Sequence, residues 1–169
     1  MKTSKKGIAL IKKWESLHDG DLKAIGLQPK MDPALIWTEG WGRAMRDSKG
    51  RFIKGSANKA LAYSRISMHT EAQADAALEQ DIKPFELQVM RATQKRKKPL
   101  SQNEFDALVV HTYNTGGSAT LFDLVSSQAP TADILNWWTT RYITGQGSKI
   151  PLKGLINRRK DEADLFISK

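Results

Sequence analysis

The stretch that decides the fold class of this chain runs from Ile8 to Gly42 and reads IALIKKWESLHDGDLKAIGLQPKMDPALIWTEGWG. It begins with the spacing of an amphipathic helix and ends in a β-branched and aromatic run that is typical of a strand. Two carboxylates occupy different settings in it. Glu15 stands at the end of the predicted helix, and Asp32 precedes the predicted strand.

The predicted helix gathers its apolar residues on one half of its circumference, at about 100° per residue. These residues are Ile8, Leu10, Ile11, Trp14 and Leu17. Glu15 lies inside this apolar half. A carboxyl group among apolar side chains is costly to ionise, and the negative end of the helix dipole disfavours ionisation as well. Glu15 is therefore a candidate general acid. The alternative is a glutamate at the rim of the apolar face that reaches water or pairs with an arginine.

Alternation along the predicted strand, Leu35 to Trp41, separates its side chains between two faces. One face is expected to carry Trp37, Glu39 and Trp41, and the other Ile36, Thr38, Gly40 and Gly42. Asp32 lies an even number of positions before Thr38, so alternation places the two side chains on the same face. A carboxylate and a hydroxyl on one side of a thin strand can hold a water molecule. The glycines let a ligand approach the backbone closely. Glu39 faces the other way and is the weaker catalytic candidate.

These residues resemble the phage-type lysozymes of glycoside hydrolase family 24. That family has a glutamate at the end of its first helix, then an aspartate, and then a threonine in a W-T-x-G-x-G strand. Glu15, Asp32 and Thr38 match these positions, with Trp37 to Gly42 as the strand signature. The resemblance implies that Glu15 protonates the leaving group and that Asp32, with Thr38, orients or activates a water molecule.

Two positions depart from the family pattern. The segment that precedes Asp32 is longer than usual and contains Asp19 and Asp21, which are alternative candidates for the aspartate. Asp32 is preferred because its spacing to Thr38 fits the family. Arg43 replaces the histidine that usually follows the last glycine.

The composition is that of an ordinary globular protein, with 40% hydrophobic and 27% charged residues in a chain of 169. This length predicts one domain with a sizeable core. The chain has no cysteine, which excludes disulfides and cysteine-based metal sites. Its net charge of +9 favours a polyanionic partner: nucleic acid, anionic lipid or an acidic cell wall. The basic N-terminus is followed by an apolar run, Gly7–Ile11, too short for a signal core or a membrane span. We therefore expect a protein made in the cytoplasm.

Most of the remaining chain is predicted to be helical. Capping boxes at Thr70 and Ser101 begin two of the helices, and Gly116 breaks the second. A small hairpin is predicted around a turn at Asp47–Gly50. Helices are predicted over residues 4–17, 58–64, 70–82, 84–93, 101–114, 120–126, 131–142 and 155–167.

Three features have both a structural and a functional interpretation. Lys95–Lys98 is expected to be a solvated loop, with an anionic wall or lipid as the alternative partner. It has no interleaved aromatic residue and no reading helix, so it does not indicate nucleic-acid recognition. His111 is expected in the core or on the surface, with a substrate contact as the alternative. Trp137, Trp138 and Tyr142 are expected in the core, although such rings also stack on sugars.

The resemblance covers nearly the whole chain and is also specific at Leu100–Gly116 and Leu152–Phe166. It implies an α+β fold, predominantly α, in a single lysozyme-like domain of residues 1–169. A small helix and β-hairpin lobe would span about residues 1–69 and a connecting helix about 70–94. A helical lobe would span about 95–169, with a cleft between the lobes.

The activity that the resemblance implies is that of a muramidase. Such an enzyme cleaves the β-1,4 link between N-acetylmuramic acid and N-acetylglucosamine in bacterial peptidoglycan, without a metal or cofactor. Trp41, Gly42 and Asn114 would contact the substrate. We expect a monomer that stays in the host cytoplasm until a separate partner releases it to the wall. The alternatives are a lytic transglycosylase that uses Glu15 alone and a basic protein that disrupts the wall or membrane by its charge.

Overall fold

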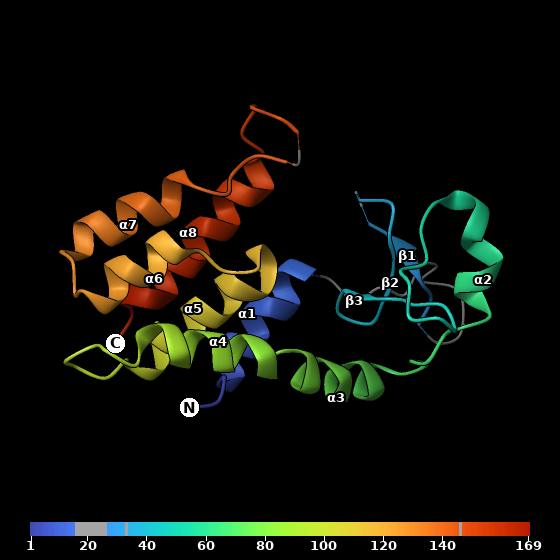
Figure 1. The fold of residues 1–169 in the computed structure, drawn as a ribbon, viewed down its shortest axis with the longest axis horizontal. Helices are drawn as coiled ribbons and strands as arrows, with labels where there is room; N and C mark the ends of the chain where they lie inside the picture. The colour runs from blue at the N-terminus through green and yellow to red at the C-terminus, as the bar shows by residue number, and fades with distance from the viewer. Residues whose placement is uncertain (16–26, 33, 146) are drawn as a thin grey trace. The chain divides into compact units, whose positions relative to one another are not determined.

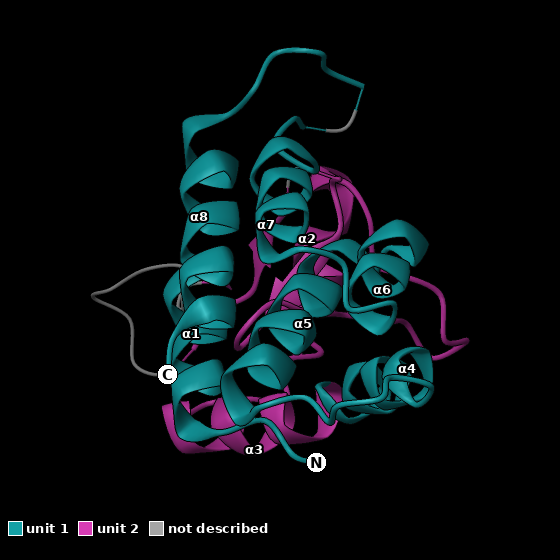
Figure 2. Ribbon diagram, turned by 90° about the vertical axis from the view of Figure 1, so that its left-hand side faces the viewer, with its two compact units in different colours: residues 1–14, 82–169 teal, residues 15–81 magenta. Residues whose placement is uncertain are grey.

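The computed structural model of the chain describes residues 1–15, 27–32, 34–145 and 147–169. It is predominantly helical, with a small antiparallel sheet of strand order β1-β2-β3 (Figure 1). The predicted fold class, α+β and predominantly α, is therefore confirmed. The chain divides into two compact units, residues 15–81 and residues 1–14 with 82–169 (Figure 2). Within the described ranges, no helix is long and apolar enough to cross a membrane.

The sheet of the 15–81 unit is built on β2 (Trp37–Glu39). This strand pairs with β1 (Lys30–Met31) on one side and with β3 (Arg43–Ala44) on the other. Thr38 is the central residue of β2 and has a partner in both neighbouring strands. All three side chains of β2 are buried, including that of Glu39. The strand therefore has no solvated face.

The predicted strand from Leu35 to Trp41 is too long. Gly40 and Gly42 have φ angles of 57° and 93°, a left-handed backbone conformation that favours glycine. They turn the chain from β2 into β3, so Trp41 lies in a turn. Strand alternation therefore does not apply to Trp41, because the regular strand ends at Glu39.

Beyond β3 the chain continues into a hairpin, which closes at the predicted Asp47–Gly50 turn. The backbone N–H of Asp47 donates to the carbonyl of Arg51 over 2.8 Å, and isolated bridges join Arg46 to Phe52 and Ile36 to Lys54. A short 3₁₀ helix (Ser56–Asn58), α2 (Lys59–Tyr63) and α3 (Glu71–Asp81) complete the unit. One hydrophobic cluster of the unit consists of Trp37, Met45, Ile53 and Ala62, with Met31 packed against it.

The other unit is organised around α5 (Gln102–Thr115), in which every residue from Phe105 to Thr112 is buried. This helix contacts α4 and α8, and α6 and α7 complete the ring of packed helices (Figure 2). The remaining helices have the bounds α1 (Lys5–Glu15), α4 (Lys83–Thr93), α6 (Ala119–Ser126), α7 (Thr131–Thr140) and α8 (Lys153–Ile167).

Local capping motifs define the starts of two helices. The Ser101 hydroxyl accepts from the Glu104 backbone N–H over 3.2 Å, and the Glu104 carboxylate accepts from the Ser101 N–H over 2.7 Å. This confirms the capping box predicted for α5. At α3 the Thr70 hydroxyl accepts from the Gln73 N–H, but the Gln73 side chain accepts from the N–H of His69. The second half of that box therefore lies one residue earlier than predicted.

The basic run Lys95–Lys98 does not consist of four solvated charges. Arg96 donates two hydrogen bonds of 3.0 Å to Glu104, the residue that also caps α5. Burial by itself raises the pKa of Glu104, but the hydrogen bonds from Arg96 and Ser101 outweigh burial and lower the pKa. Three of the residues are exposed, as predicted for a loop, whereas Arg96 is half-buried and secures the start of α5.

Candidate active site

Glu15 is the last residue of α1, and its carboxyl group lies against the turn between β2 and β3. A Cβ atom at Gly42 would stand 3.2 Å from Glu15 Oε2. Gly42 also has a positive φ, so two independent constraints favour glycine there. A side chain at Gly42 would crowd the half-buried Glu15 carboxyl. The structure thus brings together two residues that the sequence separates by the whole loop and strand.

Asp32 is held at the end of the β1–β2 ladder. Its backbone N–H donates to the carbonyl of Ile36, and its Oδ1 accepts from the Ile36 N–H, both over 2.8 Å. One carboxylate oxygen therefore replaces the backbone carbonyl that would otherwise complete the ladder. In the part of the chain that the structure describes, Oδ2 has no hydrogen-bond partner, so it can accept a bond from a water molecule. The prediction from strand alternation did not include this role of Oδ1, because it assigned the Asp32 side chain only to one face of the strand.

Thr38 lies in the middle of the sheet and is only 4% exposed. Its hydroxyl donates to the carbonyl of Lys30 across the β1–β2 pair over 3.0 Å. The proton of the hydroxyl is thereby used within the sheet, and its oxygen lone pairs remain as acceptors. The side chain can accept a hydrogen bond from a water molecule but is not available to donate one.

Two side chains fix the Gly40–Gly42 turn to α3. The indole N–H of Trp41, a buried residue, donates to Asp75 over 2.7 Å. The guanidinium of Arg43 donates two hydrogen bonds of 2.8 Å to Asp81 and one to the carbonyl of Ala77. Arg43, which departs from the family pattern, therefore serves as an anchor of the turn that carries Gly42.

The Glu39 side chain is buried and hydrogen-bonded to the segment that leads into α3. Its carboxylate, 5% exposed, accepts from the hydroxyl and N–H of Ser67 and from the N–H of Met68. These three donors satisfy the buried charge and hold the segment that leads into α3. This environment agrees with its lower rank as a catalytic candidate.

Asn114 lies in the last turn of α5, in the other unit, and its side-chain oxygen accepts a hydrogen bond from Arg159. Arg159 belongs to a buried polar cluster. One of its terminal nitrogens also lies 2.8 Å from Nδ1 of His111, and it pairs with Glu162 over 3.1 Å. Glu162 in turn contacts His111 and accepts from the Trp138 indole, both over 3.0 Å. This cluster fixes the orientation of the exposed Asn114 amide.

Arg159 and Glu162 were not among the residues that the sequence singled out. Their signal was present: two charges three positions apart stand on the face of α8 that also carries the buried Ala163 and Phe166. A charge on the apolar face of a helix indicates a buried partner. Their partners, however, come from α5 and α7, and the sequence does not give those long-range contacts.

His111 is fully buried, so of the core or surface position that was predicted for it, the structure shows the core. Burial lowers its pKa and outweighs the nearby Glu162 carboxylate, which raises it. The imidazole is therefore neutral. Nδ1 lies between Arg159 and the Glu162 carboxylate, whereas Nε2 has no hydrogen-bond partner in the described part of the chain. Trp138 is also in the core as predicted, whereas Tyr142 is 44% exposed and the prediction of a core position for it is wrong.

Several candidates lie outside the described residues. They include Asp19 and Asp21, the alternatives to Asp32, and the predicted extension of the first helix to Leu17. Among the described residues, no group of three or more histidine, cysteine, aspartate or glutamate side chains is arranged to hold a metal ion.

Comparison with known proteins adds independent information. The sequence profile of the Phage lysozyme family matches residues 21–162. An endolysin of Acyrthosiphon pisum secondary endosymbiont phage 1 is 31% identical over 175 residues, with 99% of each chain covered. The solved endolysin of Escherichia coli O157:H7 phage FAHEc1 is 30% identical with a TM-score of 0.67, covering 99% of this chain and 94% of that one. The muramidase domain of SpmX from Asticaccaulis excentricus has a TM-score of 0.70 at 24% identity, with 99% of each chain covered, and shares the fold.

Proposed function

Since the chain belongs to the phage lysozyme family, we propose that Glu15, Asp32 and Thr38 carry out its hydrolytic chemistry. The chain is a lysozyme-type glycosidase that hydrolyses peptidoglycan for host cell lysis. The bond that we propose it cleaves is the β-1,4 link between N-acetylmuramic acid and N-acetylglucosamine. The observation that carries this assignment is the position of the Glu15 carboxyl beside Gly42, where a Cβ atom would stand 3.2 Å from Oε2.

Glu15 acts as the general acid in this proposal. It gives its proton to the glycosidic oxygen as the bond to the anomeric carbon breaks, so the leaving sugar departs as a neutral alcohol. Positive charge develops on the sugar ring at the same time.

Asp32 acts on the water molecule. Oδ1 is fixed by the Ile36 N–H, and this bond orients the carboxylate so that Oδ2 can accept a proton from the attacking water. The Thr38 oxygen accepts the second hydrogen bond of that water. Water attack on the far face requires carboxyl groups about 6.5–9.5 Å apart and inverts the anomeric carbon, whereas a nucleophilic Asp32 requires about 5–5.5 Å and retains it. The anomer of the fresh product distinguishes the two.

Substrate contacts in this proposal come from Gly42, through its backbone, and from the amide of Asn114. Trp41 contributes by holding the turn in place through Asp75. We further propose that the protein is a monomer stored in the host cytoplasm and released by a separate membrane-permeabilising partner. Size-exclusion chromatography and a lysis assay with and without membrane permeabilisation test these two points.

The test is mass spectrometry of glycans released from purified peptidoglycan by the wild type, Glu15→Gln and Asp32→Asn. Glu79→Gln and Asp123→Asn are matched controls, since they make the same chemical changes at exposed positions. We expect the wild type and both controls to release fragments that have gained water at a reducing N-acetylmuramic acid. Anhydro ends that form without Asp32 would instead identify a lytic transglycosylase. Wall lysis that persists in Glu15→Gln would support charge-driven disruption.

A further inference from the structure

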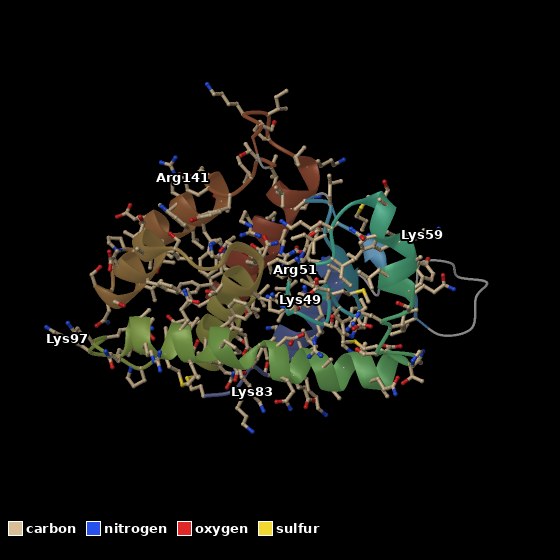
Figure 3. All side chains as sticks on the ribbon, turned by 45° about the vertical axis from the view of Figure 1, so that its right-hand side comes forward. Lys49, Arg51, Lys59, Lys83, Lys97 and Arg141 are labelled. Carbon is tan, nitrogen blue, oxygen red and sulfur yellow. The ribbon has the colours of Figure 1, made fainter. Side chains whose placement is uncertain are left out.

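Positive charge is concentrated in one segment of the 15–81 unit. Residues 43–70 contain seven lysines and arginines and a single acid, Asp47, which leaves +6 of the chain's net charge of +9. The segment covers the hairpin and α2, and Figure 3 labels Lys49 and Arg51 on the hairpin and Lys59 on α2. Such a density of one sign attracts a polyanion. It stands on the same unit as Glu15 and Gly42.

Two contacts hold the side chain of Arg46 on the hairpin. Its guanidinium carbon lies 3.9 Å from the centre of the Phe52 ring, and Phe52 is its cross-strand partner. One of its terminal nitrogens donates to the carbonyl of Gly50 over 2.7 Å. The stacking and this hydrogen bond fix the plane of the guanidinium, while its other N–H groups remain available for a ligand. A planar guanidinium held in this way matches the geometry of a carboxylate.

Lys54 extends the same face of the hairpin. It follows Phe52 by two residues, so both side chains stand on one side of the strand, and its ammonium lies 6.0 Å from the Phe52 ring. Lys54 also lines a hollow of about 330 Å³, together with Phe52 and Asn58. Arg51 reaches this hollow too, but its charge is matched by Asp47 at 2.8 Å. In the described part of the chain, Arg46 and Lys54 have no acidic partner.

We propose that Arg46 and Lys54 bind free carboxylates of the stem peptide that branches from the glycan strand. This inference rests on the proposed function, because it assumes that a glycan strand lies at Gly42. Arg46 follows Gly42 by four positions, so their Cα atoms are at most about 14 Å apart. A stem peptide of about four residues spans a similar distance when extended. A peptide attached to a sugar at Gly42 therefore reaches the hairpin.

The surface fits a discrete carboxylate better than a lipid bilayer. Phe52, the exposed ring of the hairpin, already has a guanidinium over it, and a stacked ring is not free to insert among acyl chains. The hollow beside it is lined by Lys54, Arg51 and Asn58, by Asp47, whose charge pairs with Arg51, and by apolar side chains. It therefore offers charged and polar contacts to a ligand group.

The experiment measures binding to insoluble cell-wall sacculi by sedimentation, in the Glu15→Gln background so that the wall is not digested. Arg46→Gln combined with Lys54→Gln removes the two cations. The matched control is Lys95→Gln combined with Lys97→Gln, which removes the same charge from an exposed loop of the other unit. Each protein is tested on intact sacculi and on sacculi whose stem peptides an amidase has removed.

We expect the hairpin variant to bind intact sacculi about fivefold more weakly, in line with the loss of two exposed ion pairs. The difference should vanish on stripped glycan, and the control pair should change affinity less than twofold on both walls. Arg46→Lys should recover part of the affinity, because it keeps the charge but not the planar fork. Circular dichroism and the thermal midpoint verify that each variant is folded.

An equal loss on stripped glycan, or an equal loss in the control pair, would overturn the proposal. So would a loss confined to vesicles of anionic phospholipid with sacculus binding unchanged, since the surface would then serve a membrane. The products that the active wild type releases report separately on the proposed function. A wild type that releases no glycan would overturn that function, and unchanged sacculus binding by the hairpin variant would overturn the stem-peptide site alone.

Discussion

The buried cluster around Glu162 and the turn around Gly42 both place carboxyl groups among polar partners, but in opposite environments. Glu162 is fully buried and accepts from an indole and two guanidinium groups, with His111 beside it. Glu15 is half-buried and lies against a glycine that has no side chain to cover it. The difference teaches that the environment of an acid, and not its burial alone, distinguishes the structural carboxylate of Glu162 from Glu15, the proposed general acid.

The largest expected effect comes from Glu162→Gln. This change leaves Arg158 and Arg159 buried without their counter-charge, and removing one partner of such a cluster costs about 3–5 kcal/mol of unfolding free energy. Urea unfolding followed by circular dichroism measures the loss. Glu79→Gln, at an exposed position of α3, should change stability by less than about 0.5 kcal/mol. A loss below about 1 kcal/mol for Glu162→Gln would show that the cluster is not a structural centre.

Glu39→Gln sharpens the comparison within the unit that carries Glu15. The glutamine side chain keeps one acceptor oxygen but has no negative charge. In the wild type, three donors from Ser67 and Met68 bind the Glu39 carboxylate. We expect a loss of about 1–3 kcal/mol in unfolding free energy. The rate of peptidoglycan cleavage per folded molecule, measured well below the thermal midpoint, should stay within about twofold of wild type. A rate loss without a stability loss would make Glu39 a second catalytic candidate.

Gly42→Ala tests whether the close approach of Gly42 to the Glu15 carboxyl is needed for the rate of peptidoglycan cleavage. The new methyl group would stand 3.2 Å from Glu15 Oε2 at a backbone φ of 93°. Gly55→Ala is the matched control, because Gly55 has a φ of 77° but nothing within 4 Å of its Cβ position. Both variants should lose about 1 kcal/mol of stability through backbone strain. Initial rates on peptidoglycan should fall about tenfold for Gly42→Ala alone, by analogy with other small displacements of catalytic groups. Equal rates in the two variants would separate Gly42 from the chemistry.

The smallest effect concerns pH. The pKa of His111 is lowered in the folded protein from an ordinary value of 6.5, so the unfolded chain binds the proton more readily. Stability should therefore fall as the pH drops below about 6.5, and the fall should continue until the pH passes the folded pKa. Thermal midpoints measured between pH 8 and pH 5 reveal this slope. His111→Gln should flatten it, whereas His69→Gln, an exposed position, should keep it; an unchanged slope in His111→Gln would refute the assignment.

Local features were predictable from the sequence because their causes are local. The capping box at Ser101, the turn at Asp47–Gly50 and the apolar stripe that ends at Glu15 each depend on residues a few positions apart. The end of β2 was missed because a glycine allows a positive φ without requiring one. Gly40 and Gly42 adopt it where the chain turns into β3.

Features that depend on long-range packing could not be predicted from the sequence. The place of Oδ1 of Asp32 in the ladder follows from the pairing of β1 with β2. The cluster at Glu162 requires α5, α7 and α8 to pack together before its charges meet. The spacing to Thr38 could nominate Asp32 as a candidate, but only the fold shows which of its oxygens is already engaged.

The most direct test of the proposed general acid measures the release of reducing ends from purified peptidoglycan by Glu15→Gln. Glu79→Gln is measured beside it at the same protein concentration, and the thermal midpoints of the two variants must be equal. Loss of a general acid removes about 10²–10⁴ of the rate, so we expect Glu15→Gln to turn over at least about a hundredfold more slowly than Glu79→Gln. Turnover within a few fold of Glu79→Gln would contradict the account, because the proton for the leaving sugar would then come from another group.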